Sequence, residues 1–110
     1  MGATKLGAYT EEQKRIAAIT KALAHPARIA ILQELAKQNN CQCGKLADIV
    51  GLAQPTVSQH LKELKNAGLI KGTIDESRAC YCLSGENLNE LSTFVNELKN
   101  AIELQLVNCC

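Results

Sequence analysis

Residues 46–70 constrain the fold of this chain more than any other stretch. They read LADIVGLAQPTVSQHLKELKNAGLI, and glycines stand at positions 51 and 68, where helices are expected to end. Two short amphipathic helices joined by a glycine-containing turn are the layout of a helix–turn–helix. We therefore predict a helix–turn–helix over residues 46–67, whose second helix runs from Pro55 to about Ala67.

This second helix divides sharply into two faces. At about 100° per residue, Val57, Leu61 and Leu64 fall within one narrow apolar sector. Short polar side chains and a lysine lie opposite or beside it, and such groups read base edges or hold phosphates. Two basic residues of the following hairpin are placed to reach the flanking DNA backbone or minor groove. The residues expected to contact DNA on these grounds are Thr56, Ser58, Gln59, Lys62, Lys71 and Arg78.

The rest of the chain predicts a mainly helical domain with one β-hairpin. A capping box at Thr10–Gln13 opens the first helix, and the proline after His25 opens the second, which gives His25 a structural role. We expect helices over residues 11–24, 26–36, 41–50, 55–67 and 87–106, and strands over 69–74 and 79–83. Residues 1–10 then form an arm, 11–106 the domain, 69–83 its wing and 107–110 a cysteine-containing tail.

Composition and charge narrow the function classes. The chain has 110 residues, of which 46% are hydrophobic and 21% charged, which is typical of one folded domain. No apolar run approaches the roughly 18 residues of a membrane span, and no signal peptide is present, so we expect a cytoplasmic protein with no membrane partner. Net charge is +3 over residues 1–53, +1 over 54–83 and −3 over 84–110. DNA contacts should therefore come from the first two parts.

Three segments carry a family resemblance: ALAHPARIAILQEL (residues 22–35), QPTVSQHLKELKNAGLI (54–70) and RACYCL (78–83). With them the chain resembles the ArsR/SmtB family of winged-helix repressors over about residues 11–106. The resemblance implies a homodimer paired through its first and last helices, which leaves double-stranded operator DNA when an inducer binds. Recognition-helix contacts of the family carry over to Gln54, Thr56, Ser58, Gln59 and His60, although the helical angle of His60 favours packing or a phosphate contact. A two-fold dimer predicts an inverted-repeat operator.

Six cysteines form three close pairs at 41 and 43, 80 and 82, and 109 and 110. We expect Cys41 and Cys43 at the start of the third helix, where the helix N-terminus lowers thiol pKa. The resemblance makes this Cys-x-Cys the anchor of the inducer, as in arsenic, cadmium and lead sensors. Some arsenic sensors carry a third cysteine where this chain has Leu46. We therefore expect further ligands from Cys109 or Cys110, with the wing cysteines as surface residues or a second arsenic site.

The number of thiolates that bind the ion indicates which ion is the inducer. Three thiolates suit trivalent arsenic or antimony, which we favour, whereas four suit zinc, cadmium or lead. DNA binding itself needs no cofactor. A repressor switched by thiol oxidation or sulfur species is an alternative, although family members of that kind carry a cysteine where this chain has Gln33. A winged helix used only for protein contacts would show no salt-dependent DNA binding. An enzyme is not expected, because the chain lacks Cys-x-x-Cys, a base near a nucleophile and a βαβ pattern.

Overall fold

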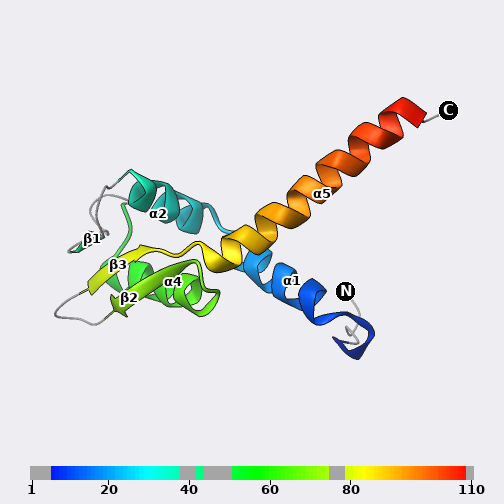
Figure 1. The fold of residues 1–110 in the computed structure, drawn as a ribbon. Coiled ribbons are helices and arrows are strands. Elements are labelled where there is room, and N and C mark those ends of the chain that lie inside the picture. The colour runs from blue at the N-terminus through cyan, green and yellow to red at the C-terminus, as the bar shows by residue number, and fades with distance from the viewer. Residues whose placement is uncertain (1–5, 38–41, 44–50, 75–78, 109–110) are drawn as a thin grey trace.

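The computed structural model describes residues 6–37, 42–43, 51–74 and 79–108. The described part is mostly helical, with one small antiparallel sheet in the strand order β1-β3-β2 (Figure 1). A short 3-10 helix, η1, precedes these elements at Leu6–Ala8. The helices are α1 (Glu11–Leu23), α2 (Pro26–Ala36), α4 (Gln54–Asn66) and α5 (Glu86–Asn108), and the strands are β1 (Gln42–Cys43), β2 (Ile70–Ile74) and β3 (Ala79–Leu83).

Local capping sets where the first two helices begin. The Thr10 hydroxyl accepts a hydrogen bond from the backbone N–H of Gln13 at 3.0 Å, and the Gln13 side chain accepts one from the N–H of Thr10 at 2.9 Å. The capping box predicted from the sequence is thereby confirmed. His25 caps α2, because its Nδ1 accepts the N–H of Ala27 at 3.1 Å, and Pro26 occupies the first turn.

The second helix of the expected helix–turn–helix is α4, which begins at Gln54, one residue earlier than predicted. Its end follows from Gly68, whose φ of 74° lies in the left-handed region that suits glycine. The N–H of Leu69 then bonds the carbonyl of Leu64 at 3.0 Å, which closes the last turn of the helix. The chain reverses at this point and enters β2.

The core lies where α1, α2 and α4 meet β2 and β3. Val57, Leu61 and Leu64 are at most 1% exposed, so the apolar face predicted for α4 is confirmed. From β3, Tyr81 reaches the same core and is 1% exposed. The cluster consists of Ile19, Ala22, Ile31, Leu35, Val57, Leu61, Leu64, Leu69, Ile70 and Tyr81. Aliphatic side chains thus supply most of the burial that holds α4 in place.

The strand β1 corrects the prediction that a helix starts at Cys41. Gln42 and Cys43 are extended and pair with β3, with Gln42 opposite Tyr81 and Cys43 opposite Cys80. The N–H and C=O groups along this edge of β3 gain partners in this way, which a helix start would not give them. Cys43 therefore does not stand at the start of a helix. Cys41 and residues 44–50 of the expected helix lie outside the described residues.

The last helix, α5, extends well beyond the rest of the molecule (Figure 1). Near its start it packs on α1, where the Arg15 guanidinium makes a two-pronged contact with the Glu90 carboxylate at 3.0 Å for each prong. This ion pair lowers the pKa of Glu90 through the hydrogen bond from Arg15. Among the described helices, no stretch has both the length and the apolar character needed to cross a membrane.

Candidate nucleic-acid interface

The outer face of α4 presents a row of polar side chains. Gln54, Thr56, Gln59 and Lys62 are exposed, and Ser58 is half-buried. Two contacts between residues four apart order this row: Gln54 donates to the Ser58 hydroxyl at 3.4 Å, and Gln59 donates to the Glu63 carboxylate at 3.2 Å. The structure therefore brings five of the sequence-predicted DNA contacts together on one helical surface, with amide and hydroxyl groups suited to base edges.

His60 departs from this pattern. Its side chain is 8% exposed, and its Nδ1 accepts a hydrogen bond from Nε of Arg28 at 3.1 Å. The imidazole rings of His25 and His60 lie 4.5 Å apart, centroid to centroid. The structure therefore places His60 outside the exposed row and against α2, where it helps to seat α4, and the DNA contact predicted for it stays a prediction.

The environment of His60 keeps its imidazole neutral. Burial lowers the pKa of His60 below its usual 6.5, and electrostatic repulsion from His25 and Arg28 lowers it further. The hydrogen-bond geometry agrees, since Nδ1 must lack a proton to accept from the arginine. Arg28 also donates to the carbonyl of Ala22 at 3.3 Å and so bridges α1, α2 and α4. Sequence reasoning missed this role of Arg28.

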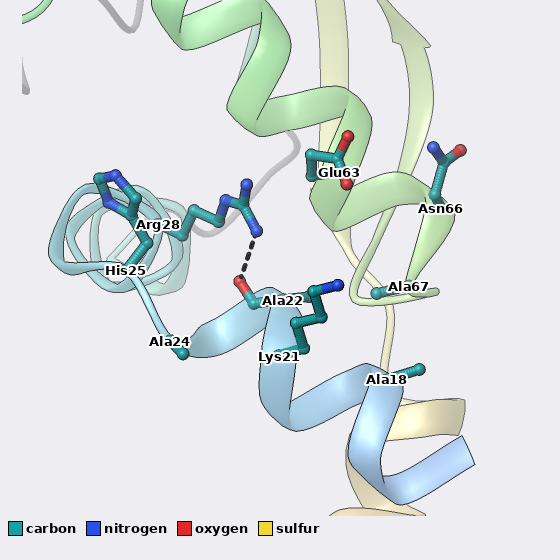
Figure 2. A pocket seen from close by; sticks show the side chains of 9 residues that line it. All are labelled: Ala18, Lys21, Ala22, Ala24, His25, Arg28, Glu63, Asn66 and Ala67. Atoms are coloured by element: carbon teal, nitrogen blue, oxygen red, sulfur yellow. Dashed lines mark hydrogen bonds between the residues drawn. The ribbon is translucent and has the colours of Figure 1, made fainter. Parts of the chain in front are cut away.

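A hollow of about 510 Å³ adjoins this cluster, between α1, the start of α2 and the second half of α4. Figure 2 shows the Arg28 side chain reaching from α2 across it towards the carbonyl of Ala22. The remaining lining combines small and charged side chains: Ala18, Lys21, Ala22, Ala24, His25, Glu63, Asn66 and Ala67. The short alanine side chains leave this space open, and Arg28 spans it to reach the carbonyl of Ala22.

The hairpin is fastened directly to α4. The Lys65 ammonium donates to the carbonyl of Gly72 on β2. Gly72 has a φ of 133°, and a Cβ there would collide with the carbonyl oxygen of Cys80, so this position requires glycine. Lys71 is exposed on β2, and its contact with the DNA backbone stays a prediction. Arg78, the other predicted wing contact, lies outside the described residues.

The cysteines of β3 lie on the face of the sheet away from the core. Tyr81 between them is buried, whereas Cys80 is exposed and Cys82 half-buried, which is the alternation predicted for this strand. Both cysteines are disulfide-bonded in this structure. Within the described side chains, no group of three or more metal-binding residues gathers. Cys109 and Cys110 lie outside the described residues.

A buried three-helix core, an exposed polar helix after a tight turn and an adjoining hairpin define a winged helix-turn-helix protein. Residues 25–71 match the profile of the bacterial regulatory proteins of the arsR family. The HTH-type transcriptional regulator YgaV of Escherichia coli K12 is 33% identical over 97 residues, which cover 88% of this chain and 95% of YgaV. The chain belongs to the arsR family. It is a winged-helix transcriptional regulator of the DNA-binding type and not an enzyme.

Two further relatives extend this likeness. The HTH-type transcriptional repressor SmtB of Mycobacterium tuberculosis is 40% identical over 70 residues, which cover 64% of this chain and 51% of that repressor. The homodimeric winged helix-turn-helix DNA-binding domain Mb0332 of Mycobacterium bovis superposes with a TM-score of 0.61 at 26% identity, covering 91% of this chain and 89% of that one. The predicted fold class, a winged helix-turn-helix, is thereby confirmed.

Proposed function

We propose that two copies of this chain bind an inverted-repeat operator in the cytoplasm and repress transcription until a thiophilic ion binds their cysteines. The observation that carries the DNA-binding part is the exposed polar row of α4, held on a buried apolar face. A helix of this kind fits the major groove of B-DNA. The homodimer and the inverted repeat follow from the family's architecture and from the exposed apolar residues along α5.

Alanine variants of α4 test the DNA-reading surface. Thr56→Ala, Ser58→Ala and Gln59→Ala should each weaken binding to a duplex selected from a random library by about 1–3 kcal/mol and relax sequence preference. Gln105→Ala, at an exposed position near the end of α5, is the matched control and should bind like the wild type. Wild-type affinity in all three α4 variants would refute the assignment of α4 as the reading helix.

The proposed inducer is trivalent arsenic or antimony, with Cys41 and Cys43 as anchor and the tail pair Cys109 and Cys110 as further ligands. Thiolates are soft ligands, and the chain holds six cysteines to supply them. Titrating the protein–DNA complex with arsenite, antimonite, zinc, cadmium and lead should show release by the first two at the lowest concentrations. The variant Cys41→Ser/Cys43→Ser should bind DNA and resist release. Release by zinc, cadmium or lead at lower concentrations would reassign the inducer.

One observation favours a second candidate, in which oxidation rather than an ion triggers release. Cys80 and Cys82 are disulfide-bonded, so sulfurs of this chain lie within bonding reach of each other. Under this reading, the thiol oxidant diamide releases DNA without any metal, and a dithiol reductant restores binding. Failure of diamide to change the DNA affinity would exclude the oxidation trigger and leave the ion trigger intact.

A further inference from the structure

We propose that the hollow between α1, α2 and α4 is a binding site for a small zwitterion of the amino-acid class. Lys21 and Arg28 hold the carboxylate of this ligand, and Glu63 holds its ammonium group. The ligand differs from the thiophilic ion proposed above, and its binding in the hollow depends neither on that ion nor on DNA. Only the effect of the ligand on operator binding rests on the proposed function.

The hollow has the size and the lining of a small-molecule site. Its volume of about 510 Å³ falls within the range of about 300–1,000 Å³ that is typical of ligand pockets. Alanines supply the apolar part of its wall, and charged side chains from three helices surround it (Figure 2). Lys21 comes from the last turn of α1, Arg28 from the first turn of α2 and Glu63 from α4. A few polar groups that converge on an apolar wall fix the orientation of a bound molecule.

The charged groups around the hollow do not neutralise one another. In the described part of the chain, neither Lys21 nor Arg28 forms an ion pair with Glu63, and the Lys21 ammonium has no hydrogen-bond partner. Arg28 uses two of its five N–H donors, one for His60 and one for the carbonyl of Ala22, so three remain for a ligand. Cations that stand apart from a carboxylate favour a ligand that carries both charges.

Charge balance narrows the ligand class further. Lys21 and Arg28 contribute two positive charges and Glu63 one negative charge. A ligand with negative charge alone would leave Glu63 facing a like charge, and a ligand with positive charge alone would meet two cations. A zwitterion suits both sides, because its carboxylate accepts from the guanidinium and the lysine while its ammonium donates to Glu63. A free amino acid carries this pair of groups.

The side chains proposed to bind the ligand also contact the DNA-reading part of α4. The Glu63 carboxylate accepts from Gln59 at 3.2 Å, and Gln59 belongs to the exposed polar row. Arg28 donates to His60 at 3.1 Å. A ligand ammonium that draws the Glu63 carboxylate towards the hollow releases Gln59, whose side chain must then be immobilised when DNA binds. The ligand should therefore weaken operator binding by about 2- to 10-fold, the usual effect of immobilising one side chain.

The first experiment uses the purified full-length protein without DNA. Its thermal unfolding is followed in the presence of each standard amino acid, and the one that raises Tm most is titrated into the protein by calorimetry. At least one amino acid should bind, and a ligand that binds only the folded chain raises its Tm. Acetate and methylammonium each carry one of the two charged groups and should bind more weakly. Acetate that binds as tightly as the amino acid would overturn the assignment to a zwitterion.

Variants then place the bound amino acid in the hollow. Lys21→Gln should weaken its binding by about 10- to 100-fold, as expected when a hydrogen bond between charged groups is lost. Lys14→Gln is the matched control and should bind like the wild type, because it removes the same charge from α1 two turns earlier and does not line the hollow. Glu63→Gln removes the partner of the ammonium group, and Ala18→Leu fills space and leaves every charge in place. Both should also weaken binding.

The outcomes separate this inference from the proposed function. If no amino acid binds, or if Lys21→Gln and Ala18→Leu bind it like the wild type, the site is wrong and the repressor stands. If the amino acid binds through Lys21 but leaves the operator affinity unchanged, its link to DNA is overturned. If the wild type binds no DNA, the proposed function fails, and calorimetry still decides the site. Should Lys21→Gln lose its fold by circular dichroism, undiminished binding in Ala18→Leu alone overturns the site.

Discussion

At the scale of single residues, the hydrogen bond between Arg28 and His60 makes the packing of α4 against α2 depend on the protonation of His60. His60 accepts from Nε of Arg28 only when its Nδ1 is unprotonated. Arginine stays charged across the accessible pH range, so a protonated His60 would lose this bond and face a positive charge instead. The folded protein therefore holds His60 neutral below the pH at which an exposed histidine takes up a proton.

This contact predicts a pH-dependent stability. The pKa of His60 is lowered from 6.5 by burial and by electrostatic repulsion from its neighbours, so the unfolded chain binds the proton more readily than the folded one. The stabilisation is complete above the unfolded pKa and is lost as the pH falls through 6.5 towards the lower folded value. Urea unfolding between about pH 5 and 8 should show a falling free energy of unfolding in that window.

The variant His60→Gln isolates the effect, because glutamine can accept from Arg28 without titrating. In this variant the free energy of unfolding should fall less than in the wild type as the pH drops through 6.5. His25→Asn keeps a helix-capping side chain but removes one neighbour that lowers the pKa of His60, so it should weaken the fall in stability at low pH only in part. If the free energy of unfolding falls at low pH in His60→Gln as it does in the wild type, groups other than His60 cause the pH dependence.

Residues on one periodic face were predictable from the sequence, whereas through-space partners were not. Val57, Leu61 and Leu64 recur at helical spacing, and burial follows from that spacing alone. Arg28 and His60 are 32 positions apart, and their contact depends on how α2 packs against α4. The helical angle of His60 near the apolar edge was the available signal, and it favoured packing or a phosphate contact over base reading.

At the scale of elements, the end of α4 is tied to the start of α5. Asn87 donates from its side chain to the carbonyl of Ala67 at 2.8 Å, beside the left-handed Gly68. A Cβ at Gly68 would strike the Asn87 amide, so the two positions fit each other closely. This contact satisfies a carbonyl that the helix end leaves without an intrahelical partner. It also links the recognition helix to the helix that projects from the domain.

Removing this link should lower stability measurably. Asn87→Ala deletes the hydrogen bond to Ala67 and should reduce the free energy of unfolding by about 1 kcal/mol. Asn89→Ala, at an exposed position two residues later on the same helix, is the matched control and should cost less. The measurement is urea unfolding of both variants. Equal losses in the two variants would assign the effect to the helix and not to the cap.

The elements themselves show where sequence patterns stop being informative. Long periodic segments such as α1 and α5 were expected within a few residues of their observed ends, because their caps and spacing are local signals. The strand β1 was expected to be the start of a helix. Its two residues form a strand because they pair with the edge of β3, about 40 positions away. The local β-propensity of a segment does not indicate such a distant partner.

At the scale of the whole molecule, the single chain is more extended than a compact domain of its length. Its radius of gyration is 17.0 Å, whereas a compact domain of this length has about 13 Å. The excess comes from α5, which projects from the rest of the molecule (Figure 1). Large apolar side chains are exposed over much of the length of this helix. They are Leu88, Val95, Leu98, Ile102, Leu104, Leu106 and Val107. At about 100° per residue, Leu88, Val95, Leu98, Ile102 and Leu106 share one face of α5, and an apolar stripe of this kind favours burial against a second copy.

Placing charges in this apolar stripe of α5 should break the dimer. The two α4 helices of the dimer would then no longer be held together. Leu98 is 48% and Ile102 is 54% exposed in the single chain, and Leu98→Glu/Ile102→Glu should yield monomers by analytical ultracentrifugation. Because a two-fold dimer presents two α4 helices about 34 Å apart, the monomer should lose most of its affinity for an inverted repeat while still binding one half-site weakly. Asn100→Glu adds a charge on the opposite side of α5 and should remain dimeric. Dimers of the double variant with full operator affinity would place the subunit interface elsewhere.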